Sequence, residues 1–555
     1  MSDIAIAQAA KLRPIREIAA SLSLGPHDFI PFGHHKAKLP LTLIDKQRAA
    51  KGRLILVSAM SPTPPGEGKT TVSIGLAQGL NRIGKKTVAV LREPSLGPVF
   101  GIKGGAAGGG YSQILPMEDI NLHFTGDFSA IEKAHNLLAA LIDNNLQSRQ
   151  NNLGIDARTV SWKRVMDMND RSLRRIVIGL GGTGNGVPRE TGFDITAASE
   201  IMAILCLAED RTDLKQRLGR IFIGYTFDRQ PVFARDLRAE GAMAALLKDA
   251  LQPNLVQTLE GYPAIIHGGP FANIAQGTNS VIATRMGLSL SDYVVTEAGF
   301  GCDLGAEKFL NIKCVSAGLT PRAVVLVATV RALKHHGGTS ADRLTEPDVA
   351  ALERGLPNLE KHIENVGHFG LHPIVAINAF QTDAAAEHDA IRTRCEALGV
   401  QAVVADVWGQ GGRGAEALAR VVADAADAND GTFRPLYDWA APVKDKILTI
   451  ARKMYGADHV EYGGDALKAL KRIETLGLEG LPICIAKTQY SFSDNPKLLG
   501  RPEGFTVLVR DIEIAAGAGF LVPITGQMMR MPGLPAEPAA AGIDIDADGH
   551  ISGLF

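Results

Sequence analysis

Short apolar runs alternate with amphipathic stretches along most of the chain. Runs that are apolar on both faces predict buried strands. They cover residues 53–59, 86–91, 175–180, 220–225, 263–268, 373–378, 400–407, 482–486 and 505–509. Between many of them lie Ala- and Leu-rich segments with helical spacing, such as 70–84 and 385–399. This alternation predicts an α/β fold in which mostly parallel sheets are covered by helices.

The length of the chain indicates more than one folding unit. At 555 residues it is several times the usual domain length of about 150 residues, so two or three domains are expected. One boundary is expected near residue 365, before the strand at 373–378, and another near 445, where a helical pattern resumes. The expected domains are therefore 1–365, 366–445 and 446–555, the last two being smaller α/β units.

Charge and cysteine content exclude several classes of protein. With 58 Lys+Arg against 59 Asp+Glu, the net charge of -1 gives no bulk attraction to nucleic acid or to an anionic membrane. No apolar run approaches the roughly 18 residues of a membrane span. The five cysteines show no CxxC spacing and the N-terminal segment is amphipathic, unlike a signal peptide. We expect a cytoplasmic protein without a nucleic-acid or membrane partner.

The 60 glycines cluster in loops that follow predicted strands, as in 101–110, 179–186 and 297–305. Ligands of parallel α/β folds bind at the carboxyl ends of the strands, where such loops lie. We therefore expect the chemistry of this protein at that edge of the sheet.

A phosphate-binding loop is expected between the strand 53–59 and the helix that follows. Its candidate nucleotide-binding residues are Thr63, Pro64, Pro65, Gly66, Glu67, Gly68, Lys69, Thr70 and Thr71. Loop amides and the helix N-terminus would face a phosphate, Lys69 would reach its outer oxygens, and Thr70 could ligate Mg²⁺. A strict G-x-x-x-x-G-K-[ST] pattern needs glycine at position 63, where this chain has threonine. The alternative is an ordinary Gly/Pro turn before a helix with a solvent-exposed lysine.

Several longer motifs occur in a fixed order and together resemble one family. They are GIKGGAAGGGY (101–111), RETGFDITAASEIMA (189–203), HGGPFANIAQGTNS (267–280), EAGFGCDLGAEKF (297–309), VATVRALKHHGG (327–338) and GFLVPITGQMMRMPGLP (519–535). With the loop TPPGEGKT, they resemble the monofunctional formate–tetrahydrofolate ligase family from about residue 25 to 540.

The resemblance implies an ATP-dependent ligase that activates formate as formyl phosphate and transfers the formyl group to tetrahydrofolate. It implies Mg²⁺, stimulation by a monovalent cation (K⁺ or NH4⁺), a polyglutamylated folate and a homotetramer. It also gives the domains their expected roles: nucleotide and formate binding in 1–365, and a contribution to the folate slot from 366–445.

Formate activation calls for cations around the transferred phosphoryl group, and the chain offers several. Lys69 is the first catalytic candidate. Arg92, directly after the strand 86–91, resembles the family arginine that binds formyl phosphate, and its planar fork suits both formate and phosphate. Glu93 could orient that arginine or help a metal; the alternative is a surface pair between Arg92 and Glu93. Lys103, in the glycine-rich loop, could add charge or be an ordinary surface lysine.

A pterin ring needs a flat apolar slot, and aromatic residues make up only 5% of the chain. Phe380 and Trp408 each follow a predicted strand and resemble the pterin-sandwiching pair of the family. Ordinary core packing is the alternative for both. Gln276 stands where a histidine is expected, and the residue that accepts the proton of the attacking amine is not identified.

Other functions remain open on the sequence alone. Gly179 to Gly184 satisfies GxGxxG, the fingerprint of nucleotide-dependent dehydrogenases, although Pro188 stands where that fingerprint requires a helix. A switch that hydrolyses ATP would also need a phosphate loop. Cys302 could be a nucleophile or a packed thiol. His368 and His372 could form a metal pair, but the glycines between them disfavour a helix.

Overall fold

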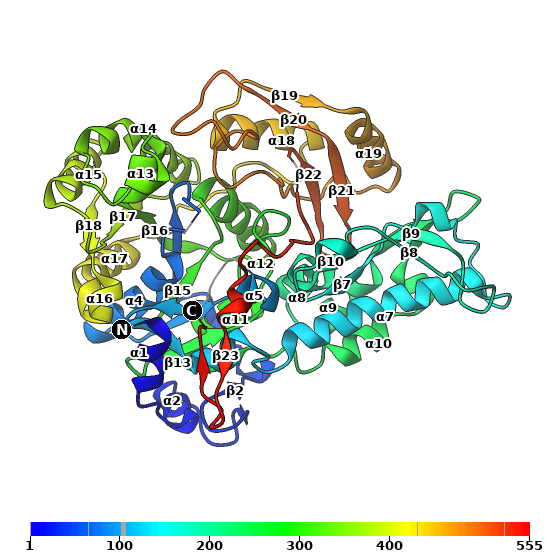
Figure 1. The fold of residues 1–555 in the computed structure, drawn as a ribbon, viewed down its shortest axis with the longest axis horizontal. Helices are drawn as coiled ribbons and strands as arrows, with labels where there is room; N and C mark the ends of the chain where they lie inside the picture. Colours follow the sequence, from blue (N-terminus) through cyan, green and yellow to red (C-terminus); the bar gives the residue numbers. More distant parts are fainter. Residues whose placement is uncertain (1, 65, 102–106, 430, 527, 555) are drawn as a thin grey trace.

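The computed structural model describes residues 2–64, 66–101, 107–429, 431–526 and 528–554. Over these residues its largest element is a 12-stranded sheet with the order β1-β2-β13-β14-β4-β15-β3-β16-β17-β18, to which β6 and β5 are attached through β13 (Figure 1). The bounds are β1 Ile30–Pro31, β2 Ala37–Lys38, β3 Arg53–Ala59, β4 Thr87–Leu91, β5 Gly108–Gly109, β6 Ser112–Leu115, β13 Asn254–Thr258, β14 Pro263–Ile266, β15 Tyr293–Glu297, β16 Pro321–Ala328, β17 Pro373–Asn378 and β18 Ala402–Ala405.

Pairing within this sheet is parallel from β14 through β4, β15, β3, β16 and β17 to β18. The pairs that β13 forms with β14, β2 and β6 are antiparallel. The prediction of an α/β fold with a mostly parallel sheet is confirmed.

Helices cover both faces of the sheet, as the strand sequences require. In β3, Leu54 and Leu56 belong to one buried hydrophobic cluster and Ile55 and Val57 to another, because successive side chains of a strand point to opposite faces. The first cluster includes side chains of α11 Val281–Leu290, α13 Val330–His336, α14 Val349–Gly367 and α15 Ala385–Ala397. The second includes α4 Lys69–Arg82, α16 Val407–Gln410 and α17 Glu416–Ala428. The predicted helices at 70–84 and 385–399 are α4 and α15.

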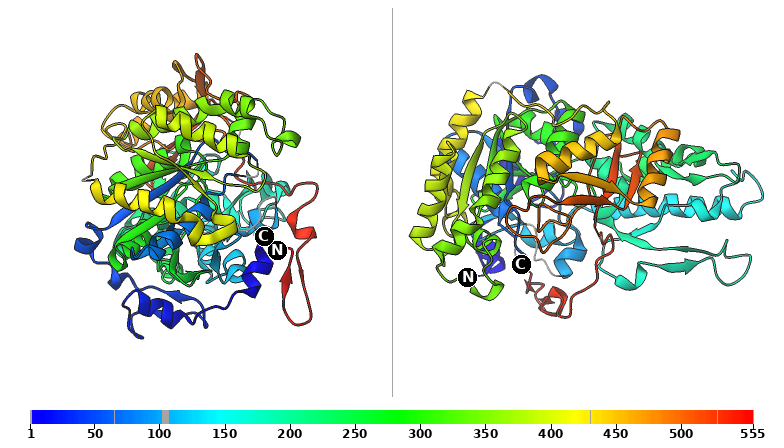
Figure 2. Two further views of the ribbon diagram at one scale, coloured as in Figure 1. Left: turned by 90° about the vertical axis from the view of Figure 1, so that its left-hand side faces the viewer. Right: turned by 90° about the horizontal axis from the view of Figure 1, so that it is seen from above.

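A long extension projects from one side of the sheet (Figures 1 and 2). Its helices are α7 Asp127–Gln147, α8 Glu200–Leu207, α9 Arg211–Gly219 and α10 Glu240–Leu246, and its strands are β7 Arg164–Met166, β8 Ile176–Ile178, β9 Arg189–Thr191, β10 Phe193–Ile195, β11 Phe222–Tyr225 and β12 Pro231–Phe233. The predicted strands at 175–180 and 220–225 form antiparallel pairs here, outside the parallel sheet. Val177 of β8 is 57% exposed, so the prediction of a buried strand at 175–180 was wrong.

The C-terminal part packs against α14 and against the extension: Lys361 of α14 donates to the carbonyl of Lys453, and the amide of Gly517 donates to Glu200 of α8. It contains α18 Val443–Ile450, α19 Gly464–Thr475, β19 His459–Tyr462, β20 Thr506–Val509, β21 Asp511–Ala515, β22 Phe520–Ile524, β23 Asp544–Ile545 and β24 Ile551–Ser552. The predicted strand at 482–486 has only isolated bridges, Ile483 with Leu521 and Ala486 with Ile524. The remaining α-helices are α1 Asp3–Ala9, α2 Ile15–Ser21, α3 Lys46–Ala49, α5 Leu96–Phe100, α6 Met117–Asn121 and α12 Val315–Ala317, and π-helical turns cover Cys302–Ala306, Phe309–Cys314 and Ala451–Tyr455.

The strands from the first two predicted domains share one sheet, because β17 pairs with β16 and β18 with β17. Helix α18 begins at Val443, next to the second predicted boundary. The division into domains 1–365, 366–445 and 446–555 stays a prediction. Among the described residues, none of the helices is long and apolar enough to cross a membrane.

Candidate active site

The loop at 60–68 joins the central strand β3 to helix α4, as expected. Gly66 and Gly68 have φ angles of 83° and 70°, which disfavour residues with a side chain. A Cβ on Gly68 would also lie 2.6 Å from Nδ2 of Asn378, at the end of β17. Both glycines are therefore required by the backbone of this loop.

Thr63 and Glu67 stabilise the same loop through hydrogen bonds with each other. The amide and the hydroxyl of Thr63 each donate to Oε1 of Glu67 at 2.7 Å, and the hydroxyl of Thr329 donates to Oε2. The Glu67 residue is only 1% exposed. Since Thr63 supplies two of these donors, the chain has a structural use for threonine where the strict motif has glycine. The carboxylate of Glu67 is directed into the loop.

The N-terminus of α4 has the features of an anion site. Its N-cap is Gly68, which provides no side-chain hydrogen bond to the first turn. The amides of Lys69, Thr70 and Thr71 begin this 14-residue helix. Helix N-termini attract phosphate through such amides and the helix dipole, so the residues present fit a nucleotide phosphate.

Thr70 and Arg92 meet at one carboxylate that was not singled out from the sequence. The hydroxyl of Thr70 donates to Oε2 of Glu297 at 2.9 Å, and Nη2 of Arg92 lies 3.6 Å from Oε1 of the same residue. Glu297 is the last residue of β15, a strand outside the predicted runs. Its motif, EAGFGCDLG, was the signal that could have found it.

Glu93 points into the protein, away from the surface. It is 4% exposed, and among the described residues no hydrogen-bond partner contacts its Oε2 atom. Burial, reinforced by the carboxylates of Asp127 and Asp167 and opposed by Lys38, raises the pKa of Glu93 well above its usual range. The alternative of a surface pair between Arg92 and Glu93 is therefore wrong.

Arg331 connects the loop to one of the two candidate folate residues. From helix α13 its guanidinium donates to the carbonyl of Gly66, and it also lies 4.3 Å from the ring centroid of Phe380. Phe380 is half-buried, in the loop after β17. Arg331 lies in the motif VATVRALKHHGG but was not predicted as a site residue.

Trp408 lies in helix α16, directly after β18, and is 38% exposed. Its indole Nε1 donates to Asp3 at 3.2 Å, and its carbonyl accepts the amide of Tyr111 at 2.9 Å. Core packing does not account for so exposed an indole. Because β17 and β18 are paired and parallel, Phe380 and Trp408 follow strands that end at the same edge of the sheet.

Of three further positions that the sequence singled out, only Gln276 can be placed. Pro65 and Lys103 lie outside the described residues. Gln276 is fully buried, and its Nε2 atom lies 3.5 Å from the carbonyl of Ala203. A buried amide does not titrate, so Gln276 cannot supply the base that a histidine there would offer.

The structure also decides among the other sequence alternatives. Gly179 to Gly184 lies in the turn between the antiparallel strands β8 and β9, with no helix after it, so the dehydrogenase interpretation is wrong. Burial raises the pKa of the Cys302 thiol, which disfavours the nucleophilic thiolate. His368 caps the C-terminus of α14 and His372 lies beyond it, so the two do not share a helical face.

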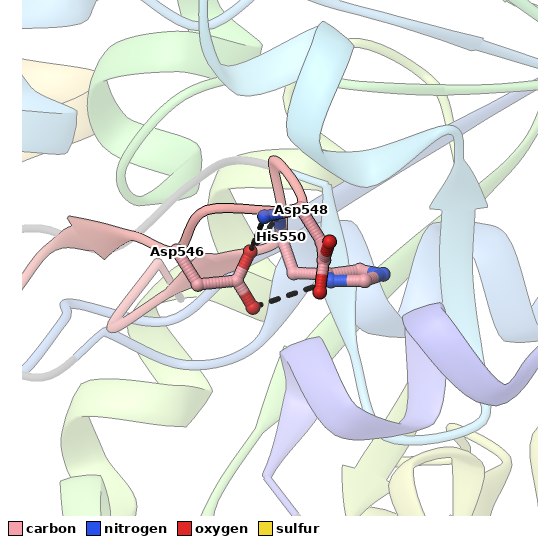
Figure 3. Close-up of side chains that lie close together, drawn as sticks. All are labelled: Asp546, Asp548 and His550. Atoms are coloured by element: carbon pink, nitrogen blue, oxygen red, sulfur yellow. Dashed lines mark hydrogen bonds and ion pairs between the residues drawn. The ribbon is translucent and has the colours of Figure 1, made fainter.

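One group of side chains in the described residues has the spacing of metal ligands: Asp546, Asp548 and His550, in the turn between β23 and β24 (Figure 3). All three are exposed. The Oδ1 atom of Asp546 accepts the amides of Asp548 and His550, at 2.9 and 2.8 Å. These bonds explain the arrangement as a hairpin turn held by Asp546, without a metal ion.

Comparison with known proteins gives one family. The chain matches the family described as formate–tetrahydrofolate ligase over residues 1–555. It is 60% identical, over 555 residues and the full length of both chains, to a formate–tetrahydrofolate ligase from Paracoccus denitrificans (strain Pd 1222). The loop before α4, the carboxylate shared by Thr70 and Arg92, and this full-length match agree: the chain belongs to the formate–tetrahydrofolate ligase family.

Proposed function

We propose that this protein couples ATP cleavage to the ligation of formate and tetrahydrofolate through formyl phosphate. The products are 10-formyltetrahydrofolate, ADP and phosphate. The observation that carries the proposal is the contact of Thr70, at the start of α4, and Arg92, at the end of β4, with the single carboxylate of Glu297. That arrangement supports a nucleotide site and a formate site side by side.

In the first step a formate oxygen attacks the γ-phosphorus of ATP. The bond between the γ-phosphorus and the oxygen that bridges it to the β-phosphate breaks, and ADP leaves. Lys69 and the α4 amides hold the phosphates, and Arg92 binds formate with its planar fork. Thr70 would hold Mg²⁺, which neutralises phosphate charge when bound. Glu93 directly follows Arg92, is buried, and donates from its backbone amide to the carbonyl of Gly268 at 2.8 Å, which supports a role in orienting that arginine.

In the second step the folate amine attacks the formyl carbon, phosphate leaves with the oxygen that came from formate, and the amine nitrogen releases its proton. Phosphate is a far better leaving group than oxide, which is the reason for activating formate first. Phe380 and Trp408 hold the pterin by its faces; the proposal is supported by the 38% exposure of Trp408 and by the half-buried position of Phe380 at the same edge of the sheet.

The remaining features of the proposal follow from the family. They are a homotetramer, a polyglutamylated folate and stimulation by K⁺ or NH4⁺. We also propose a cytoplasmic location, which the cysteines support: Cys206, Cys302, Cys314, Cys395 and Cys484 are all buried free thiols.

Omitting each substrate in turn tests the proposed function. ADP release and 10-formyltetrahydrofolate formation are followed in the purified protein with MgATP, formate and tetrahydrofolate. We expect both products together only when all three substrates are present. Release of ADP without formate, and no formylated folate, would instead identify a switch that hydrolyses ATP.

A further inference from the structure

We propose that Glu297 is a positioning residue that couples the metal-nucleotide site to the formate site. Its two carboxylate oxygens hold the Thr70 hydroxyl and the Arg92 guanidinium in the orientations that the two ligands need. The proposal deepens the function proposed above and rests on it.

The sheet places Glu297 between its two partners. Strand β15 pairs on one side with β3, which leads into the loop before α4, and on the other side with β4, which ends directly before Arg92. The register pairs Glu297 with Val57 of β3 and Thr296 with Val90 of β4. The side chain at the end of β15 can therefore reach both neighbouring loops.

The hydrogen bond with Thr70 determines which way that hydroxyl points. Its hydrogen is directed to Oε2 of Glu297 at 2.9 Å, so the oxygen keeps its lone pairs for another ligand. A hydroxyl that had to reorient first would bind a divalent cation less well, because the donor would face the cation. Glu297 thus orients the Thr70 hydroxyl so that its oxygen can face a divalent cation.

The ion pair with Arg92 fixes the second site. Nη2 of Arg92 lies 3.6 Å from Oε1, while its Nε atom is buried with no hydrogen-bond partner among the described residues. The Glu297 side chain is 4% exposed and that of Arg92 26% exposed, so the pair is partly withdrawn from water. Because only one nitrogen of the Arg92 guanidinium is anchored, the other nitrogens can donate hydrogen bonds to a small anion such as formate.

A carboxylate that serves both partners makes the two sites dependent on each other. Neutralising it should weaken nucleotide binding only when Mg²⁺ is present, and should also weaken formate binding. If Glu297 merely stabilised the fold, its replacement would lower the affinity for ADP equally with and without Mg²⁺.

The test compares Glu297→Gln, Thr70→Val and the double variant by titration calorimetry with ADP, with and without Mg²⁺. We expect each single variant to bind MgADP at least tenfold more weakly and metal-free ADP within twofold of wild type. The MgADP affinity of the double variant should equal that of the single variant with the lower affinity, because both changes remove one shared interaction. The KM for formate should rise in Glu297→Gln and not in Thr70→Val.

Glu209→Gln is the matched control, since Glu209 is also a carboxylate paired with an arginine, Arg285, at 2.8 Å, and has no place in the proposed site. It should bind both forms of ADP normally. If Glu297→Gln does not fold, Glu297→Asp, whose shorter side chain cannot reach both partners, should show the same Mg²⁺-dependent loss.

Wild-type MgADP affinity and formate KM in a folded Glu297 variant would overturn the inference. So would additive losses in the double variant. These results are distinguishable from failure of the proposed function, in which the wild-type protein itself would show no formate-dependent release of ADP.

Discussion

At the scale of single residues, the sequence could predict those that form part of a motif. Lys69 and Thr70 follow from the loop pattern, and Arg92 from its place after a strand. Glu297 also lies in a motif, EAGFGCDLG, but the motif does not reveal its role, because its partners are Thr70, 227 residues away, and Arg92, directly after β4. Only the pairing of β15 with both β3 and β4 brings the three together.

Arg92→Lys should lower kcat/KM for formate about 10- to 100-fold, since charged hydrogen bonds contribute about 1.5 to 3 kcal/mol each. Lysine keeps the charge but loses the planar fork that can anchor to Glu297 and still bind formate. Steady-state kinetics with varied formate measures the effect. Wild-type kinetics would remove Arg92 from the formate site.

Trp408→Ala should raise the KM for tetrahydrofolate about tenfold, because aromatic stacking contributes up to about 1.5 kcal/mol beyond buried area. The KM for ATP should stay the same. Trp408→Phe, which keeps a flat face but loses the hydrogen bond to Asp3, serves as the control and should retain most of the affinity. An unchanged KM in Trp408→Ala would show that the indole does not contact folate.

At the scale of elements, apolar runs predicted some of the buried strands of the central sheet, namely β3, β4, β14 and β17. The same pattern misplaced β8 and β11, whose apolar runs resemble those of the central strands but form small antiparallel pairs. The central strands β15 and β16 were not among the predicted runs, although both are almost wholly buried. A short apolar run does not reveal which sheet it joins, because pairing depends on distant residues.

Helix α13 contacts two loops that the sequence analysis did not connect, the loop before α4 and the loop after β17. Through Arg331 it contacts both the loop before α4 and the Phe380 ring. We expect Arg331→Met to raise the KM for ATP and for tetrahydrofolate about fivefold each, the loss of about 1 kcal/mol per contact. Both constants are measured in the coupled formylation assay.

Arg354→Met is the control for this variant. Arg354 is an exposed arginine of the neighbouring helix α14, and it donates to the carbonyl of Gly337 at 3.1 Å. Its replacement should change neither constant. If Arg331→Met alters only one KM, the guanidinium does not link the two sites.

At the scale of the whole molecule, several ionisable groups are buried far from the candidate site. His135 is one: its Nδ1 atom lies 2.8 Å from the hydroxyl of Ser199, and its ring stacks on Trp162. Burial lowers the pKa of His135 to about 4. The folded protein therefore binds fewer protons here than the unfolded chain between pH 4 and the ordinary histidine value of 6.5.

This contribution to stability is present above pH 6.5 and is lost as the pH falls toward 4. At 1.36 kcal/mol per pKa unit, it amounts to about 3 kcal/mol. His135→Gln should lower the melting temperature most at pH 7.5, and the gap from wild type should narrow toward pH 4.5. A gap that is constant across this range would show that His135 titrates alike in both states.

The central claim is that formate is activated as its phosphate, and oxygen transfer tests it most directly. The protein is incubated with MgATP, tetrahydrofolate and formate labelled with oxygen-18, and the released phosphate is analysed by mass spectrometry. If formyl phosphate forms, one labelled oxygen appears in each phosphate produced with 10-formyltetrahydrofolate. Formylated folate accompanied by unlabelled phosphate would contradict the account, since formate would then never have bonded to phosphorus.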